Sequence, residues 1–247
     1  MDNAQATVNI LNDECITLSK LSKSIKGKSI LSNINATVNR GDVIALLGAN
    51  AAGKTTLIET ILGFNIPSDG EVLFNNAENA VNLSHQTKQT IGYVPQTEDL
   101  LSFLSIDVYL QSISTFYSEW NSELVTSLID EWRLPHEQII DSLSLGQKQM
   151  VSILSAVGHE PDILILDEPV SSLDPLSRRK FLKALIELQI RNNTTVIFST
   201  HIITDVERIA NRLWVMKNGK LVLDQSIDDA KDNSALSLED LFLEINQ

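Results

Sequence analysis

Short, continuous runs of apolar residues alternate along this chain with longer segments in which apolar residues recur every three or four positions. The first pattern is typical of buried parallel strands, and the second is typical of amphipathic helices. The apolar runs predict strands at Ile16–Leu18, Ile34–Val38, Val43–Leu47, Glu71–Phe74, Ile91–Val94, Ile163–Leu166, Thr195–Phe198, Leu213–Met216 and Lys220–Leu223. Helices are predicted over Lys54–Leu62, Pro175–Arg191 and Ile202–Arg212. Because strands and helices alternate, the sequence predicts an α/β domain with parallel strands.

Three further stretches refine this prediction. From about residue 98 to residue 158 the spacing is helical, with apolar residues at Leu124, Leu128 and Trp132, which predicts an inserted helical region. The pair Asn218-Gly219 lies between the last two predicted strands and is the preferred two-residue hairpin turn, because both positions accept positive φ angles. Residues from about 224 to 247 predict a short acidic tail with one amphipathic helix over Leu238–Ile245.

Composition places the chain among globular proteins. Its 247 residues are 43% hydrophobic and 21% charged, which suits one large domain, or one domain with a subdomain. A formal net charge of -13 repels nucleic-acid phosphate, so we expect no nucleic-acid partner. Cys15 is the only cysteine, which excludes an intrachain disulfide. The N-terminal residues lack a signal-peptide pattern and no apolar run approaches about 18 residues, so a role in transport requires a separate chain to form the pore.

A phosphate-binding motif follows the strand at Val43–Leu47. The eight residues Gly48, Ala49, Asn50, Ala51, Ala52, Gly53, Lys54 and Thr55 fit the pattern G-x-x-x-x-G-K-[ST]. Gly48 is expected to let the chain leave the strand sharply, and Gly53 to let the backbone approach a phosphate closely. Successive N–H groups at the start of a helix attract the anion. The Lys54 ammonium suits the β- and γ-phosphates, and the Thr55 hydroxyl is an oxygen ligand suited to Mg²⁺.

An acidic pair follows the apolar strand Ile163–Leu166. Asp167 and Glu168 lie where that strand ends, which is the edge at which ligands bind in open α/β sheets. Neighbouring residues on a strand point in opposite directions, so we expect the two carboxylates to have different roles. Asp167 is predicted to hold Mg²⁺, directly or through water, and Glu168 to act as general base toward the attacking water. His201 follows the strand Thr195–Phe198 at the same kind of strand end, where it is placed to contact the γ-phosphate.

Further short motifs occur in a fixed order. Tyr93-Val94-Pro95-Gln96 comes first, then Leu143-Ser144-Leu145-Gly146-Gln147, then Asp167-Glu168-Pro169, Ser172-Leu173-Asp174 and His201. Together with the phosphate motif, this order resembles the nucleotide-binding domain of the ATP-binding cassette (ABC) superfamily from about residue 16 to residue 223. In this resemblance Gln96 is the Q-loop glutamine, residues 143–147 are the signature motif, Asp174 belongs to the D-loop and His201 is the switch histidine. No single motif is decisive, but six in the correct order are highly specific.

The resemblance implies a P-loop NTPase fold for a single ABC ATPase domain over residues 1–247. That fold has a mostly parallel core sheet, an N-terminal antiparallel β subdomain and an inserted α-helical subdomain at about 98–158. The implied reaction is ATP hydrolysis with Mg²⁺ as cofactor. The resemblance assigns Glu168, His201 and Gln96 to catalysis and the phosphate loop with Thr56 to the nucleotide. It places Thr55, Gln96 and Asp167 around the metal.

The resemblance also implies partners. Two such domains form a head-to-tail dimer, as a homodimer or a heterodimer, with each ATP between the P-loop of one subunit and the signature of the other. Ser144 and Gly146 are then expected to contact the γ-phosphate in trans. A separate transmembrane permease subunit is implied, with this chain on the cytoplasmic face of the membrane. The expected function is an ATPase that powers transport, with export favoured by the compact single cassette.

Three residues depart from the family's pattern. Ala51 stands where a P-loop glycine is usual, and because alanine tolerates only negative φ comfortably, we expect the loop to adopt a conformation that suits it. Leu145 replaces a glycine of the signature and is expected to add bulk beside the trans phosphate. Ile25 stands at the adenine-stacking position, where an apolar contact replaces an aromatic one.

Two alternatives remain open at this point. A soluble ABC ATPase that drives macromolecular assembly, such as iron–sulfur cluster biogenesis, is compatible with the length of the chain. A P-loop protein that only senses nucleotide is disfavoured, because Glu168 and His201 are both present.

Overall fold

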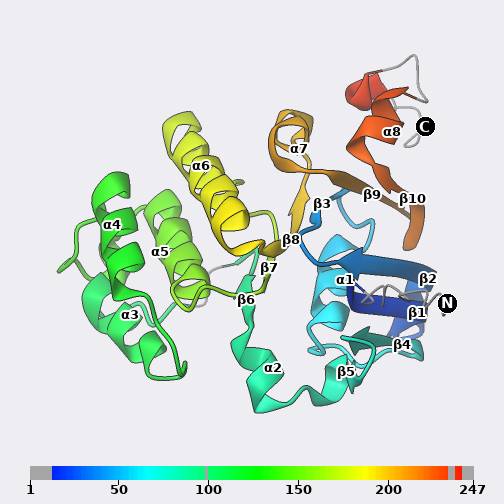
Figure 1. Ribbon diagram of the computed structural model, residues 1–247, viewed down its shortest axis with the longest axis horizontal. Helices are drawn as coiled ribbons and strands as arrows, with labels where there is room; N and C mark the ends of the chain where they lie inside the picture. The colour runs from blue at the N-terminus through cyan, green and yellow to red at the C-terminus, as the bar shows by residue number, and fades with distance from the viewer. Residues whose placement is uncertain (1–12, 98–99, 233–236, 241–247) are drawn as a thin grey trace, which may run out of the picture.

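The computed structural model describes residues 13–97, 100–232 and 237–240, with the side chains of residues 231 and 232 left out (Figure 1). The strands are β1 (Glu14–Ile25), β2 (Lys28–Asn39), β3 (Val43–Gly48), β4 (Asp69–Phe74), β5 (Glu78–Asn79), β6 (Ile91–Val94), β7 (Ile163–Leu166), β8 (Thr195–Thr200), β9 (Arg212–Lys217) and β10 (Lys220–Ser226). The α-helices are α1 (Lys54–Ile61), α2 (His85–Gln89), α3 (Ile106–Ser114), α4 (Ser122–Trp132), α5 (Leu145–Val157), α6 (Pro175–Asn192), α7 (Ile203–Ile209) and α8 (Ile227–Asp232).

These strands form two sheets. The core sheet has the order β10-β9-β3-β8-β7-β6, and every neighbouring pair in it is parallel except β10 with β9. The second sheet has the order β2-β1-β4-β5 and is antiparallel. The predicted fold class, a P-loop α/β fold with a mostly parallel core sheet and an N-terminal antiparallel sheet, is confirmed.

The core sheet separates two apolar layers, because side chains along each strand alternate between its faces. On β3, Ile44 and Leu46 pack with the antiparallel sheet and α1, whereas Ala45 and Leu47 pack with α5 and α6. Every residue of β3, β7 and β8 is buried, which explains their continuous apolar runs. Figure 1 shows α5 and α6 on one side of this sheet and α1 with the antiparallel sheet on the other.

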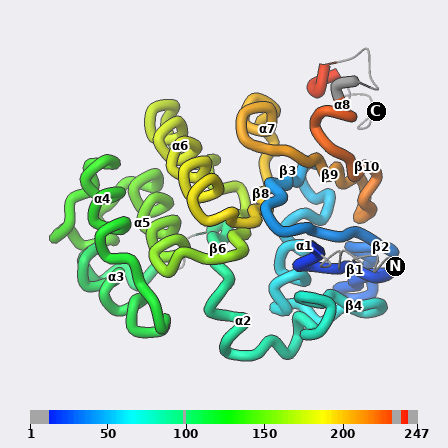
Figure 2. Tube along the Cα trace, viewed as in Figure 1, coloured from blue at the N-terminus to red at the C-terminus, as the bar shows by residue number. Residues whose placement is uncertain are grey.

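The helices between β6 and β7 lie at one end of the molecule. In the tube view of Figure 2, α3, α4 and α5 occupy the end opposite the antiparallel sheet. Within the described ranges, no helix is long and apolar enough to cross a membrane.

Several element boundaries differ from the sequence prediction. The helix predicted to reach Arg212 ends at Ile209, and Arg212 begins β9. The reason is tertiary: the Asn211 N–H donates to the Val43 carbonyl at 3.0 Å, and its side-chain oxygen accepts from the Val43 N–H at 2.9 Å. These two bonds draw the segment onto the sheet beside β3.

The first two strands are longer than predicted, and the tail differs as well. A turn at Lys26-Gly27, with φ angles of 50° and 78°, joins β1 to β2 in one long hairpin. The short helix α8 was not predicted, although Ser226 accepts from the Asp229 N–H at 2.9 Å in the manner of a helix cap. Of the helix predicted at Leu238–Ile245, residues 241–245 lie outside the described part of the chain.

Candidate functional site

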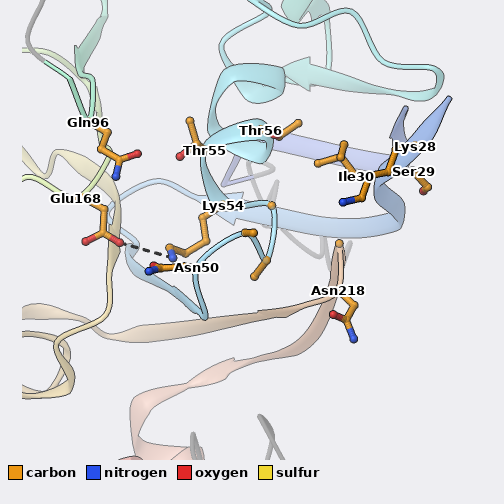
Figure 3. A pocket seen from close by; sticks show the side chains of 14 residues that line it. Lys28, Ser29, Ile30, Asn50, Lys54, Thr55, Thr56, Gln96, Glu168 and Asn218 are labelled. Carbon is orange, nitrogen blue, oxygen red and sulfur yellow. Dashed lines mark ion pairs between the residues drawn. The ribbon is translucent and has the colours of Figure 1, made fainter. Parts of the chain in front are cut away.

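A cavity of about 630 Å³ opens beside the start of α1 and the ends of β6 and β7 (Figure 3). Its lining comprises the phosphate loop, two residues that follow strands of the core sheet, the first residues of β2, and the turn between β9 and β10. These residues are Lys28, Ser29, Ile30, Asn50, Ala51, Ala52, Gly53, Lys54, Thr55, Thr56, Gln96, Glu168, Asn218 and Gly219. The structure thus gathers most of the predicted nucleotide residues with the predicted Gln96 and Glu168.

The phosphate loop contains an alanine, Ala51, in the left-handed region of backbone conformation. Ala51 has a φ angle of 64°, so the expectation of a negative φ at this alanine is wrong. The fold holds it there, because Ala52 closes a turn by donating its N–H to the Ala49 carbonyl at 3.1 Å. Gly48 also has a different role from the one expected: its φ is not positive, but a Cβ atom there would lie 2.8 Å from the Met216 carbonyl oxygen. Close packing, and not a sharp turn, requires this glycine.

Two lysines, Lys28 and Lys54, line the cavity, and Lys54 is the one in the phosphate loop. Its side chain is only 7% exposed, and the Nζ atom donates to the Gly48 carbonyl at 2.8 Å. The same Nζ lies 3.6 Å from the Glu168 Oε1 atom (Figure 3). A buried ammonium held by one carbonyl and one carboxylate is available to an incoming phosphate, which offers stronger charge-assisted bonds.

Asp167, which directly precedes Glu168 in the chain, is fully buried and does not line the cavity. Its Oδ1 accepts from the Ser199 hydroxyl at 2.5 Å, and the Ser199 oxygen accepts from the Glu168 N–H at 2.8 Å. The Asp167 Oδ2 atom is buried without a hydrogen-bond partner among the described residues. Ser199 was missed as a functional residue, although it stands two positions before His201. Burial first, and then the negative charges of Asp167 and Glu59, raise the pKa of Tyr93 to about 12, so its hydroxyl stays neutral.

The Glu168 side chain has different partners from that of Asp167, and both residues lie beyond the end of β7 at Leu166. Its Oε2 lies 2.9 Å from the His201 Nδ1, while Oε1 faces Lys54. The residue adopts a φ of 50°, an unfavourable angle for a side chain with a Cβ. Such angles concentrate at functional sites, where the surrounding structure enforces them.

The donor set is compatible with Mg²⁺. This ion prefers oxygen ligands and commonly takes one or two carboxylates together with substrate phosphates. The orphaned Oδ2 of Asp167 marks a buried carboxylate oxygen in need of a partner, and the Thr55 hydroxyl and the exposed Gln96 side chain line the adjoining cavity. Among the described residues no group of three or more His, Cys, Asp or Glu is close enough to hold a metal alone. The site therefore fits Mg²⁺ brought in with a phosphate, and does not fit a metal caged by protein.

The signature residues lie elsewhere. Ser144 caps α5: its Oγ accepts from the Gln147 N–H at 3.3 Å, and the Gln147 Oε1 accepts from the Ser144 N–H at 2.9 Å. This reciprocal capping box explains the Ser and Gln of the motif. Leu143 is buried, whereas Leu145 begins the helix with 67% of its surface exposed. None of these residues lines the cavity of the phosphate loop.

A second cavity of about 600 Å³ collects the signature and the D-loop. Ser144, Leu145, Gly146 and Gln147 line it together with Asp174. Asp174 caps α6 by accepting from the Leu176 and Ser177 N–H groups at 2.9 and 3.2 Å. One chain thus holds the predicted phosphate-loop residues and the predicted signature residues in two separate cavities.

The wall of the first cavity beyond the phosphate loop differs from the prediction. Ile25, placed by resemblance at the adenine position, lies at the end of β1 with its side chain exposed and does not line the cavity. Lys28, Ser29 and Ile30 line it instead. The Asn218-Gly219 turn was found in the sequence as a hairpin signal, but nothing local indicated that it would reach the phosphate loop.

Fold and site together define a P-loop ATPase of the cassette type. A sequence model described as ABC transporter matches residues 31–171, more than half of the chain. The chain therefore belongs to the ABC transporter family and is an ABC ATPase.

Among particular relatives, the chain is 31% identical to the bacitracin transport ATP-binding protein BcrA of Enterococcus faecalis, covering 87% of this chain and 70% of that protein. The solved structure of an ATP-binding subunit of an ABC transporter matches with a TM-score of 0.85 at 27% identity, covering 93% of this chain and 98% of that one. A dimeric ATP-binding cassette in a post-hydrolysis state, bound to ADP and Pi, shares the fold with a TM-score of 0.77 at 23% identity, covering 86% and 98%.

Proposed function

We propose that this chain is the subunit that powers a membrane transporter by hydrolysing MgATP at a site completed by a second cassette subunit. The observation that carries the proposal is the separation of two half-sites in one chain, with Lys54 lining one cavity and Ser144 the other. A head-to-tail pair brings each phosphate loop against the signature of its partner. Such a pair has twofold symmetry and contains two equivalent sites.

In the first half-site we assign residues 48–56 to the triphosphate. Lys54 exchanges its contacts with Gly48 and Glu168 for phosphate oxygens, and the N–H groups at the start of α1 face the anion. Thr55, Gln96 and Asp167 would hold Mg²⁺, which when bound neutralises negative charge on the phosphates. We retain Ile25 as a proposed contact near the adenine ring of the nucleotide.

Glu168 is assigned as the general base. When Lys54 turns to the phosphates, the carboxylate loses its nearest cation and is free to accept a proton from the attacking water. His201 keeps the carboxylate oriented through the 2.9 Å contact of its Nδ1. Ser199 is proposed to hold Asp167 and Glu168 in place, because its hydroxyl bonds to the Asp167 carboxylate and to the Glu168 N–H.

The second half-site supplies groups in trans. Ser144 and the first N–H groups of α5 would meet the γ-phosphate of the partner's nucleotide, which uses the positive end of a helix of 13 residues. The exposed Leu145 adds apolar bulk at this point, and Asp174 lies in the same cavity. We propose that residues 98–158 act as a helical subdomain that carries this half-site.

A membrane partner is proposed to dock near the segment that contains Gln96. Phe64 and Phe103 are exposed large apolar residues, and Phe103 follows Gln96 by seven positions. Phe64 packs edge-on against Tyr93 of β6, with ring centroids 5.6 Å apart, and β6 leads to Gln96. We propose a location on the cytoplasmic face of the membrane and transport in the direction of export.

Complementation in trans tests the composite site. Lys54→Ala destroys the phosphate half-site and Ser144→Arg the signature half-site, so each variant alone is expected to be inactive. If two copies of this chain form the dimer, an equal mixture restores about a quarter of the wild-type ATPase activity, because half of the dimers are mixed and each has one intact site. A mixture without activity, from variants that remain folded, would reject the homodimeric composite site.

The transport role is tested by the partner. Affinity purification of the tagged chain from detergent-treated membranes is expected to recover a polytopic membrane protein that stimulates the ATPase. Recovery of a soluble scaffold alone would reject the transport proposal in favour of an assembly ATPase. Uptake of a candidate substrate into inverted vesicles that hold the complex would support export.

A further inference from the structure

The turn between β9 and β10 lies against the phosphate loop, although the two are far apart in sequence. The Gly219 N–H donates to the Ala52 carbonyl of the loop at 3.0 Å, and the Gly219 carbonyl accepts from the Ser32 N–H of β2 at 2.8 Å. One residue therefore connects the phosphate loop to the antiparallel sheet through its two backbone groups.

No other residue type fits at this point. Gly219 has a φ of 76°, which is unfavourable for residues with a Cβ. A Cβ atom would lie 2.1 Å from the Ile30 carbonyl oxygen and 2.9 Å from its carbonyl carbon. These are backbone atoms of a strand, so a side chain at position 219 would push the turn away from β2.

Residues of β2 and of the β9–β10 hairpin also pack closely against two glycines of the phosphate loop. A Cβ on Gly53 would lie 3.1 Å from the Leu31 side chain and 3.2 Å from the Ile30 carbonyl oxygen. A Cβ on Gly48 would lie 2.8 Å from the carbonyl oxygen of Met216, the residue two positions before the turn. The loop that contains the strained Ala51 is thus enclosed by β2 and the β9–β10 hairpin, which is how a strained conformation persists.

The hydrogen bond from Gly219 to the Ala52 carbonyl also sets the direction of the next backbone N–H group, that of Gly53. A trans peptide is planar, and its carbonyl and N–H point in opposite directions. Because the Ala52 carbonyl faces Gly219, the N–H of Gly53 in the same peptide group points away from the turn. That N–H has no hydrogen-bond partner within the described part of the chain, and Gly53 lines the cavity at the start of α1.

We propose that Gly219 is a positioning residue for nucleotide binding. Its N–H fixes the peptide plane between Ala52 and Gly53, and so directs the Gly53 N–H at a phosphate. Through Ser32, the same residue links that plane to the antiparallel sheet. The inference rests on the proposed nucleotide half-site and adds a residue distant in sequence from every motif of that site.

Gly219→Ala tests the proposal, with Gly27→Ala as the matched control. Gly27 has a φ of 78°, and a Cβ there would meet nothing within 4 Å, so both variants strain a turn but only one displaces it. We expect Gly219→Ala to weaken MgATP binding by about tenfold in calorimetry, the factor set by loosening one charge-assisted hydrogen bond. Its kcat at saturating ATP should change less than its KM, and Gly27→Ala should bind like wild type. Binding by Gly219→Ala within about twofold of wild type would overturn the proposal.

Hydrogen exchange in the wild-type protein provides a measurement that does not depend on a variant folding. The Ser32 amide does not line the cavity, so MgADP should slow its exchange only through Gly219. The Lys20 amide, bonded to the Asn35 side chain at 2.9 Å in the same sheet, is the control and should not change. Unchanged Ser32 exchange in protein that binds MgADP would contradict the proposed link. Failure of the wild-type protein to bind MgADP would instead reject the nucleotide half-site itself.

Discussion

Glu168→Gln separates nucleotide binding from hydrolysis. The substitution keeps the shape of a side chain that is 9% exposed, but removes the charge that faces Lys54 at 3.6 Å and the oxygen proposed to accept a proton from water. Loss of a general base lowers a rate by about 10²–10⁴-fold. Binding should be unimpaired, because Lys54 no longer has to leave a carboxylate in order to reach the phosphates.

The structure also predicts an effect on stability. Without nucleotide, the buried Lys54 of the variant keeps its bond to the Gly48 carbonyl but loses its ion pair with Glu168, and removing one partner of a buried ion pair costs about 3–5 kcal/mol. With MgATP the phosphates replace the missing carboxylate. The rise in Tm on adding MgATP should therefore be larger for Glu168→Gln than for wild type.

Three measurements test this reasoning on one sample. Phosphate release under single-turnover conditions gives the rate, thermal scans with and without MgATP give the stability difference, and size exclusion should show an ATP-bound dimer that persists. Glu59→Gln, on α1 outside the cavity, is the control and should behave like wild type. Turnover by Glu168→Gln above roughly a tenth of the wild-type rate would remove Glu168 from the role of base.

Three further substitutions have defined outcomes. Lys54→Ala should weaken MgATP binding itself, measured by calorimetry, and unchanged affinity would count against the phosphate loop. His159 is buried against Tyr117, with ring centroids 3.9 Å apart, and burial lowers its pKa to about 4. Below pH 6.5 His159 is protonated in the unfolded chain but stays neutral in the folded chain. The free energy of unfolding should therefore fall by about 3 kcal/mol between pH 6.5 and 4. In urea unfolding at a series of pH values, His159→Gln should reduce this fall. Ala51→Gly should stabilise the protein by about 0.5–1 kcal/mol in urea unfolding, because glycine accepts the φ of 64° without strain, and a loss of stability would contradict the strain.

Local sequence determined those parts of the protein that depend on neighbours in the chain. The apolar runs of β3 and β7 must be continuous because both faces of these strands are buried, so their positions could be read directly. The phosphate motif could also be recognised in the sequence, because its glycines, lysine and threonine belong to one continuous strand–loop–helix unit. The acidic pair followed because a parallel strand delivers whatever comes next to the ligand edge of the sheet. Their catalytic roles stay predictions until the variants are measured.

Tertiary structure decided what depends on distance between remote segments. Asn211 bonds to Val43, so α7 ends earlier than predicted. Ser199 of β8 belongs to the site because it bonds to Asp167, which follows the neighbouring strand β7. The contact of Gly219 with Ala52, and the separation of Ser144 from the phosphate loop, were equally absent from any local pattern. Periodicity reports which face of a strand or helix is buried, but not which remote residue covers it. Only the packed sheets, with their fixed strand order and register, bring such residues within hydrogen-bond reach or hold them apart.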